Sequence, residues 1–554
     1  MRKRNIRKFT KWISALLCAV LALSAVGCGG SAQTQPTATP APTTDGDKVG
    51  GNNLPVSGGS INIVMPANPA SLNPLEANTR ELVDLFGLIY DSLVRYDESM
   101  RPLPGLAERW TLSEDGLTWT FYLRKDAMFH NDKALTAQDV VYTLDQLSAI
   151  KNDPQKTSLY TDVLDLIVSY TAVDTNTITI TTQRKSARLL HGLTFPILQS
   201  GTASATSVAP GTGAYRVSSY EAGSQMELTA NTNWWRRTPY ITTIIAKAMP
   251  DPDTALSSMN VRLVDVVHTS SLTANSYKQQ GVTNVYELMT QEYECIIPNL
   301  RRAVMSDVRM RTAIIEALDR NTIITEAYLS HAVSSDVPIP PDSYLYDQTH
   351  TQHAYNPARA QQLLAEMGYA DTDGDGILEK DGQKLTLSVI VNENNLNTAR
   401  VDAARMAKDQ LKAVGIDCQV TTLDWNTYNT RLKNGDFDLA FAGFSIGNDG
   451  DLSFIVGSGA SQNYSGYTSA TMDSYLNTYI EATEETEIVA AASDVQKLFA
   501  TDLPLISLYF RTNSLVCSAA IQGIRNSRNM EVYKAIEQWF LLREEDENKA
   551  ATPQ

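Results

Sequence analysis

The chain has 554 residues and a formal net charge of −16, from 46 basic and 62 acidic side chains. Nucleic acids are bound through clustered Lys and Arg, so this acidic excess argues against DNA or RNA as a partner. The length allows two or more lobes, each with its own core.

The N-terminus reads as an export signal. MRKRNIRKFTK carries six basic residues and no acid, and an apolar run over about 12–26 follows it. That run is shorter than the roughly 20 apolar residues that cross a bilayer, and a basic start before a short apolar core is typical of a secretory signal. Ala25-Val26-Gly27-Cys28 resembles the end of a bacterial lipoprotein signal, in which the cysteine is acylated and becomes the new N-terminus. An ordinary secretory signal with an incidental cysteine is the alternative.

A polar segment follows Cys28. Residues 29–58 are mostly Gly, Ser, Thr, Pro, Gln and Ala, with too few apolar side chains to offset the entropy lost on ordering. We therefore expect a flexible spacer that tethers a globular body to the outer face of the cytoplasmic membrane. Loss of the signal removes its six basic residues and takes the net charge of the mature chain from −16 to −22.

The first half of the body is predicted to be rich in strands. INIVMPANPASLNP (61–74) indicates a buried strand that runs into a loop, and the alternating Trp119, Phe121 and Leu123 indicate a second strand. Thr136 and Asp139 have the spacing of a capping box, which predicts a helix start. A third strand is expected within 173–182.

From about residue 296 the pattern changes to alternating helices and strands. Ser306 is a plausible N-cap for a helix, and Asn356, followed by Pro357 and ended by Gly368, marks another. LTLSVIV (385–391), a helix over about 398–414 and IDCQVTTL (416–423) predict a strand–helix–strand unit, and DFDLAFAGF (436–444) a further buried strand. Crossovers of this kind form parallel sheets, so we expect an α/β fold.

Two motifs suggest an enzyme or a metal site, and both are incomplete. GFSIG (443–447) matches the nucleophile elbow of hydrolases, but the turn-forming NDGD follows it and all six histidines precede Ser445. DTDGDG (371–376) resembles the start of a calcium loop, yet its twelfth position is Gly382 instead of the usual Glu. We therefore predict no catalytic residue and no metal or cofactor, with Ser445 idle and DTDGDG a tight acidic turn.

The remaining candidates for special chemistry are also weak. His350 and His353 have no acid or cysteine close by in the sequence, as a metal site would require. Apart from Cys28, the body retains the odd and sparse set Cys295, Cys418 and Cys517, which is not a disulfide framework. Small buried cysteines are the expected outcome.

Several stretches together resemble one protein family. LPGLAERWTLSEDGLTWTFYLRKDAMFHNDKALTAQDVVYTL (103–144), APGTGAYRV (209–217), LTANTNWW (228–235), AYNPARAQQLLAEMGY (354–369) and DWNTYNTRLKNGDFDLAFAGF (424–444) are similar, in this order, to the extracellular solute-binding proteins of family 5. This family includes the oligopeptide-, dipeptide- and nickel-binding proteins of ABC importers. The resemblance spans roughly residues 57–530.

The resemblance implies a two-lobed clamshell of the periplasmic-binding-protein type, with an extra subdomain in lobe I. The implied order is a signal peptide (1–27), the lipidated Cys28 and its linker (28–58), lobe I (59–292, with the subdomain over about 76–194), lobe II (293–509), a return to lobe I (510–545) and a polar tail (546–554).

The resemblance also implies where a solute would bind. In peptide-binding relatives an aspartate that meets the ligand's amine follows a Gly-Trp strand end; here Phe444 replaces the tryptophan and an ungapped match places Gly447 at the acid. Asp449 or Asp451 could serve if the loop is shifted, or they could simply solvate it. The implied ligand-binding residues are Asn68, Phe444, Ser445, Asn448, Asp449, Asp451, Asn463, Tyr464 and Tyr509.

The sequence thus predicts a monomeric, lipid-anchored binding protein that delivers a peptide or similar solute to an ABC permease. A nickel-chelate or sugar carrier of the same fold, or a peptide-sensing lipoprotein without a transport role, are the alternatives.

Overall fold

The computed structural model describes residues 54–350, 353–393, 398–525, 527–529 and 531–542. The predicted signal, Cys28, nearly all of the linker and the polar tail lie outside these residues. Within the described part of the chain, no helix is both long and apolar enough to cross a membrane.

The first lobe is built around a four-stranded sheet in the order β1 (Ser60–Pro66), β10 (Thr243–Met249), β9 (Gln225–Ala230) and β8 (Tyr215–Glu221). β1 pairs with β10 in parallel, and every second residue of β1 is buried, as the predicted strand requires. Helix α1 (Arg80–Ile89) starts at Thr79, whose side chain accepts a hydrogen bond from the backbone N–H of Leu82. The apolar side chains of α1 pack into the core of this lobe.

A second four-stranded sheet forms the subdomain of the first lobe. Its order is β4 (Ala107–Leu112), β5 (Thr118–Leu123), β7 (Thr177–Thr182) and β6 (Ile167–Asp174), and α2 (Ala137–Lys151) contacts β6 and β7. The predicted capping box of Thr136 and Asp139 is confirmed at the start of α2. The alternating side chains predicted on β5 are all buried.

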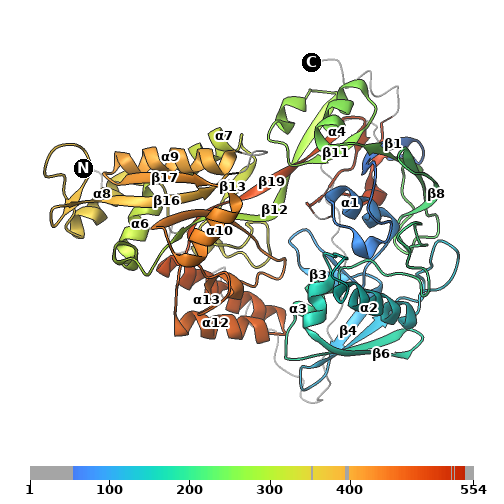
Figure 1. The fold of residues 1–554 in the computed structure, drawn as a ribbon. Coiled ribbons are helices and arrows are strands. Elements are labelled where there is room, and N and C mark those ends of the chain that lie inside the picture. The colour runs from blue at the N-terminus through green and yellow to red at the C-terminus, as the bar shows by residue number, and fades with distance from the viewer. Residues whose placement is uncertain (1–53, 351–352, 394–397, 526, 530, 543–554) are drawn as a thin grey trace, which may run out of the picture. The chain divides into compact units, whose positions relative to one another are not determined.

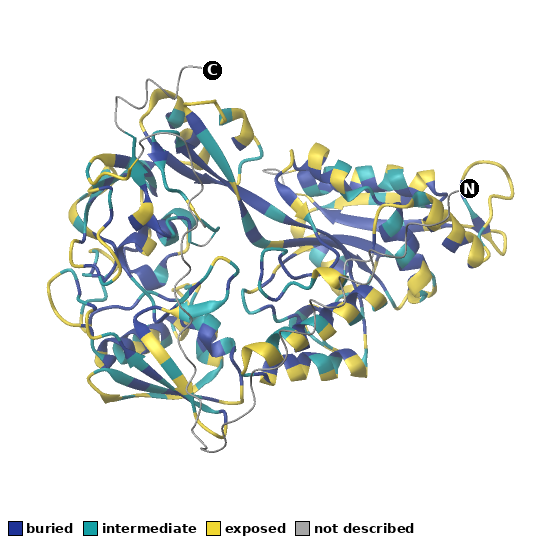
Figure 2. Ribbon diagram, turned by 180° about the vertical axis from the view of Figure 1, so that it is seen from behind, coloured by how far each residue is buried: buried dark blue, intermediate teal, exposed yellow. Residues whose placement is uncertain are grey.

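The second lobe contains the predicted strand–helix–strand unit. β16 (Thr386–Asn392) pairs in parallel with both β17 (Asp417–Leu423) and β18 (Leu439–Ser445), and α9 (Ala399–Ala413) makes the crossover. Buried apolar side chains of the helices pack against both faces of this sheet in two clusters. Figure 2 shows the buried strands between more exposed helices. Cys295, Cys418 and Cys517 are buried and free, as expected.

One predicted helix start is wrong by one residue. Asp307, not Ser306, caps α6 (Val308–Ala317), because its carboxylate accepts the backbone N–H of Arg309. Ser306 instead ends the short helix α5 (Ala303–Ser306). Asn356 does cap α8 (Pro357–Glu366), and Gly368 follows it with φ +87°, a conformation that favours glycine.

The remaining elements complete the two lobes. They are α3 (Arg188–Gly192), α4 (Pro252–Ser258), α7 (Arg320–Ala327), α10 (Trp425–Asn434), α11 (Ser453–Val456), α12 (Ala470–Glu481), α13 (Glu485–Asp502), β2 (Val94–Tyr96), β3 (Pro102–Pro104), β11 (Val266–Thr269), β13 (Ala332–Ser334), β14 (Glu379–Lys380), β15 (Gln383–Lys384), β20 (Ile521–Gln522) and β21 (Phe540–Leu541).

Two long antiparallel strands, β12 (Thr283–Pro298) and β19 (Ile506–Ser518), run from one lobe to the other (Figure 1). One end of the pair lies beside β11 and contributes Leu288, Leu515 and Cys517 to the core of the first lobe. The other end pairs with β18 and packs in the second lobe. The β12–β19 register shifts between Met289 and Tyr293, which places an irregularity in the middle of the crossing.

The C-terminal residues return to the first lobe. Val532, Ile536 and Trp539 are buried in the same core as α1 and β1. This return places residues from the end of the chain beside α1 and β2, where they line the cavities described next.

Candidate functional site

Two adjacent cavities lie beside α1 and the C-terminal return. The larger, of about 360 Å³, is lined by residues of the first lobe alone. The smaller, of about 260 Å³, lies between the lobes. The two share six lining residues, so they are neighbouring compartments: Val83, Ser92, Tyr96, Tyr160, Thr194 and Glu531.

The smaller cavity draws its wall from both lobes and from the crossing strand. Tyr96, Tyr160 and Thr194 come from the first lobe, Met289–Gln291 from β12, and Asn448 from the turn after β18 in the second lobe. Because hinge motion around a ligand closes cavities of this kind, a molecule held here would couple to the arrangement of the lobes. We therefore take the smaller cavity as the candidate binding site, although the other is larger.

Hydrogen bonds between lining side chains hold the polar groups of the smaller cavity in position. Gln291 on β12 donates from Nε2 to Oδ1 of Asn448 over 2.5 Å, which joins the crossing strand to the turn of the second lobe. Arg528 donates to Asp342 over 2.6 Å, and Arg528 is also bonded to the backbone oxygen of Glu98. These pairs connect groups far apart in the chain, so the shape of the cavity depends on how the two lobes meet.

The larger cavity has aromatic walls around the half-buried Asp91. Asp91 accepts hydrogen bonds from Nε1 of Trp234 (3.2 Å) and Nε1 of Trp235 (2.9 Å). Across the cavity, Arg236 pairs with Glu537 of the C-terminal return over 2.6 Å. Two indole rings and an ion pair give this compartment both apolar surface and fixed charge.

Acids outnumber bases around the two cavities. Seven carboxylates and four basic side chains line them, and no described lining residue is a histidine or cysteine. This charge balance favours a solute that carries an amine over a strongly anionic one, since a buried ammonium needs a negative partner. The acids are Asp84, Asp91, Asp97, Glu98, Asp342, Glu531 and Glu537, and the bases are Arg95, Arg236, Arg528 and Lys534.

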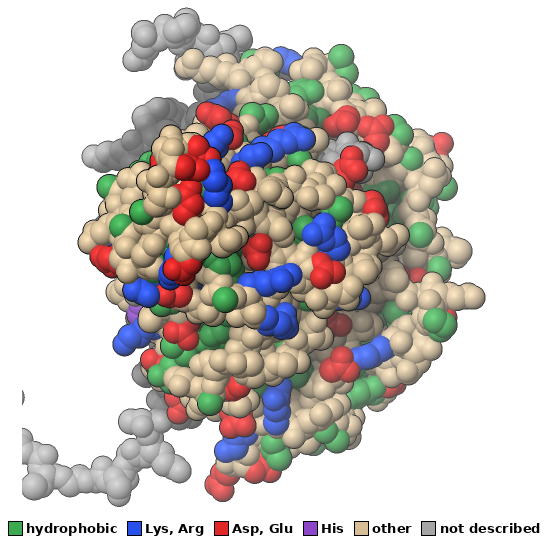
Figure 3. Space-filling view, turned by 60° about the vertical axis from the view of Figure 1, so that its left-hand side comes forward, with side chains coloured by type: hydrophobic (Ala, Val, Ile, Leu, Met, Phe, Trp, Pro, Cys, Tyr) green, Lys and Arg blue, Asp and Glu red, His purple; other side chains and the backbone are tan. Residues whose placement is uncertain are grey.

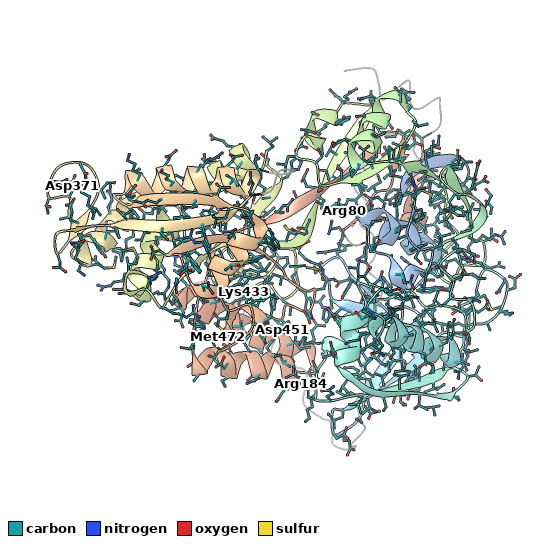
Figure 4. The ribbon with its side chains drawn as sticks, in the orientation of Figure 1. Arg80, Arg184, Asp371, Lys433, Asp451 and Met472 are labelled. Carbon is teal, nitrogen blue, oxygen red and sulfur yellow. The ribbon has the colours of Figure 1, made fainter. Side chains whose placement is uncertain are left out.

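A second contact joins the lobes beyond the cavity. Arg188 at the start of α3 bonds Asp449 over 2.7 Å and Asp451 over 2.9 Å, and both carboxylates belong to the loop after β18. The three side chains are largely buried, with 25%, 18% and 14% of their surfaces exposed. We call this triad the Arg188 clasp. Figure 4 shows Asp451 on the side of the second lobe that faces the segment of Arg184 and α3.

Neighbouring groups hold the clasp in place. The hydroxyl of Tyr479 on α12 donates to the backbone oxygen of Asp449. His191 lies under the stacked ring of Tyr344, with an interplanar angle of 7°, and burial lowers the pKa of His191 to about 4. His191 therefore stays neutral at neutral pH and adds no second positive charge to the clasp.

The pKa of Asp449 defines the pH range of the clasp. Burial raises this pKa, but the charge of Arg188, the hydrogen bond that Arg188 donates and, once it is protonated below about pH 4, the charge of His191 outweigh burial and lower it. A carboxylate with a depressed pKa stabilises the folded state above its unfolded pKa, and that contribution is lost as the pH falls through the folded value. The Arg188–Asp449 pair is thus intact at neutral pH and is lost only in acid, as the pH falls through the depressed pKa of Asp449.

Comparison with known proteins decides the family. The model of the bacterial extracellular solute-binding proteins, family 5, matches residues 101–466, more than half of the chain. The chain belongs to this family.

The relatives of this solute-binding protein are named after different ligands. The oligopeptide-binding protein AppA of Bacillus subtilis is 25% identical over 97% of this chain and 100% of its own length. The dipeptide-binding protein of Escherichia coli is 26% identical over 69% of this chain and 75% of its own. Heme-binding protein A of Haemophilus influenzae is 26% identical over 78% and 84%.

Solved structures confirm the predicted clamshell fold of the solute-binding protein. HbpA2 from Haemophilus parasuis superposes with a TM-score of 0.76 at 21% identity, covering 88% of this chain and 100% of that one. AppA from Bacillus subtilis, in complex with a nonapeptide, gives 0.61 at 22% identity over 88% and 100%.

Few of the predicted ligand-binding residues line the two cavities. Asn448 lines the smaller one, and Asp449 and Asp451 form the clasp. Asn68 lies exposed after β1, Ser445 is exposed at the end of β18, and Tyr464 is half-buried. The other three are buried inside the second lobe: Phe444 against Phe454, Tyr509 against Tyr328, and Asn463 in hydrogen bonds to its own loop.

Sequence reasoning missed most of the cavity wall and the cation of the clasp. The Trp234-Trp235 pair was visible within LTANTNWW as part of the family resemblance, but nothing in the sequence tied it to Asp91. Arg188 is the last residue of the basic run QRKSAR (183–188), and no pattern distinguishes it from its exposed neighbour Arg184.

The GFSIG motif does not form a nucleophile elbow. Residues 448–449 form a turn after the strand, and the next helix, α11, starts only at Ser453. The elbow requires a helix directly after the serine. The turn predicted from NDGD is thereby confirmed.

Proposed function

We propose that this protein is a lipid-anchored solute-binding protein of an ABC importer, which captures a peptide or peptide-like solute between its lobes and delivers it to a membrane permease. The observation that carries this proposal is the smaller cavity, whose wall combines the first lobe, the crossing strand and the turn after β18. A solute that binds to both lobes stabilises one arrangement of the lobes over the others. A permease can recognise that arrangement.

A free strand edge supports a peptide as the solute. β18 pairs with β12 as far as Ser445, but its pairing with β16 ends at Phe441. Along Ala442–Ser445 the second edge of β18 therefore has no strand partner among the described residues. An extended peptide can add to such an edge through main-chain hydrogen bonds. The names of the AppA and dipeptide-binding relatives point to the same class of solute.

We propose that the acid-rich lining recognises the peptide's amine. The test is calorimetric titration with peptides recovered from the purified protein and identified by native mass spectrometry, each compared with its N-acetylated form. Loss of a buried charge pair typically costs about 2–5 kcal/mol, so acetylation should weaken binding by more than tenfold. Equal affinity for both forms would show that the amine is not recognised.

Asp449 and Asp451 were candidates for direct contact with that amine, and the clasp supports a different role. Both carboxylates are already bonded to Arg188, so an entering ammonium would have to displace a guanidinium. We propose instead that they hold the lobes together through Arg188.

The anchor is proposed from the sequence alone. Cys28 at the end of an export signal, followed by a polar spacer, suits a protein that must remain near its permease while its lobes move. Fractionation of cells that produce the Cys28→Ala variant should show the protein leaving the membrane fraction. Retention of the variant at the parent's level would contradict the anchor.

A further inference from the structure

The acidic loop 371–379 lies at the end of the second lobe that is farthest from the first lobe, as the position of Asp371 in Figure 4 shows. Asp371, Asp373, Asp375 and Glu379 each offer an oxygen, and these oxygens all lie within 4.8 Å of one another. Three of the acids are exposed at alternate positions of the loop, and Glu379 comes from β14. Four converging carboxylates repel one another unless a cation lies among them, and in this structure the ammonium of Lys384 contacts two of the four.

Glu379 is the observation that distinguishes this loop from an acidic turn. Only 7% of the residue is exposed, and its Oε1 is buried without a hydrogen-bond partner. Its Oε2 accepts the backbone N–H of Thr372 over 2.7 Å and the Thr372 hydroxyl over 2.8 Å, which fixes the carboxylate beneath the loop. A buried carboxylate oxygen without a partner is costly, and a metal ion would satisfy it.

We infer that this loop binds a divalent cation, with Ca²⁺ as the chemical class that fits. Calcium loops of the EF-hand type place ligands at positions 1, 3, 5, 7, 9 and 12, the seventh through a backbone carbonyl, and a glycine at position 6. Asp371, Asp373, Asp375 and Glu379 occupy positions 1, 3, 5 and 9, and Gly376, with φ +87°, is at position 6. The sequence argued against calcium because Gly382 stands at position 12, but the buried Glu379 supplies the fourth carboxylate from position 9.

Lys384 competes with the cation. Its ammonium, on the paired strand β15, contacts Asp373 over 3.1 Å and also bonds Asp375. The side chain is 43% exposed, so it can swing into solvent when a metal ion enters. A lysine that must be displaced weakens metal binding, and extracellular calcium modules have dissociation constants of about 0.1–1 mM.

The test is titration of the purified protein with CaCl₂, followed by calorimetry and by thermal unfolding. We expect the parent to bind one Ca²⁺ with a Kd of about 0.1–1 mM and to unfold at a higher temperature as Ca²⁺ rises. Asp373→Asn and Glu379→Gln should each weaken binding at least tenfold, whereas Lys384→Gln should strengthen it several-fold. Asp381→Asn is the matched control, because it removes a charge from the β14–β15 turn outside the cluster and should leave the Kd unchanged.

The results of these titrations distinguish a Ca²⁺-binding site from an acidic turn that binds no metal ion. A parent without saturable Ca²⁺ binding, or one weakened equally by Asp381→Asn and Glu379→Gln, would overturn the inference. Weaker binding in the Lys384→Gln variant would do the same, because it would make the lysine a support instead of a competitor. The exposed Asp373→Asn variant tests the site even if Glu379→Gln fails to fold.

Discussion

Replacement of Arg400 by methionine is expected to lower the free energy of unfolding of the second lobe by about 3–5 kcal/mol. Arg400 on α9 forms two hydrogen bonds of 2.8 Å with Glu294 on β12, and a third of 2.7 Å with Asn392 on β16. The side chain of Glu294 is only 4% exposed, so the variant would leave a buried carboxylate without its counter-charge. Denaturant unfolding of parent and variant measures the difference.

Two variants show whether the charge pair causes this loss. Arg405→Met removes an exposed arginine from the same helix and should change stability little, since exposed ion pairs contribute about 0–1 kcal/mol. Glu294→Met combined with Arg400→Met should recover much of the loss, because an apolar pair leaves no unpaired charge. If the single Arg400→Met variant is as stable as Arg405→Met, the pair does not hold α9 to the sheet.

Loss of the Arg188 clasp is expected to weaken solute binding by roughly 30-fold or more. Arg188→Met leaves Asp449 and Asp451 facing each other without their shared cation, and breaking such a pair costs about 2 kcal/mol or more. The unpaired carboxylates destabilise only the arrangement in which the two lobes are in contact, so we expect the lobes to separate. Calorimetric titration gives the affinity, and small-angle X-ray scattering of the solute-free variant should show a larger radius of gyration.

Arg184→Met is the control for the clasp. Arg184 is exposed four residues earlier in the chain, and the same substitution there should leave affinity and radius of gyration unchanged. If Arg188→Met also leaves both quantities unchanged, the ion pairs do not stabilise the solute-binding arrangement.

Local features of the fold were predictable because they depend on neighbouring residues. The capping box of Thr136 and Asp139 and the cap at Asn356 require only side chains within three positions of the backbone groups that they bind. The β16–α9–β17 unit follows from a strand–helix–strand pattern with a short crossover. The N-cap of α6 was misplaced because Ser306 and Asp307 are both good caps, and the helix before Asp307 decided between them.

The site was much less predictable because its groups come from distant parts of the chain. Arg188 and Asp449 are separated by 261 positions and meet only where the lobes touch. The cavity wall joins Tyr96, Met289 and Arg528, which belong to different lobes and to the returning C-terminus. The family resemblance located the loop after β18, but the partners of that loop are set by tertiary packing.

Calorimetric titration of a Thr194→Trp variant tests most directly whether solute is held in the two cavities beside α1. Thr194 lines both cavities, so an indole at this position would fill space that the solute needs. With a solute recovered from the parent protein, we predict at least 100-fold weaker binding, and no such loss in a Thr468→Trp control on an exposed loop of the second lobe. Circular dichroism and solute-free thermal unfolding would verify that both variants are folded. A folded Thr194→Trp protein that binds the solute as tightly as the parent would contradict a binding site in these cavities.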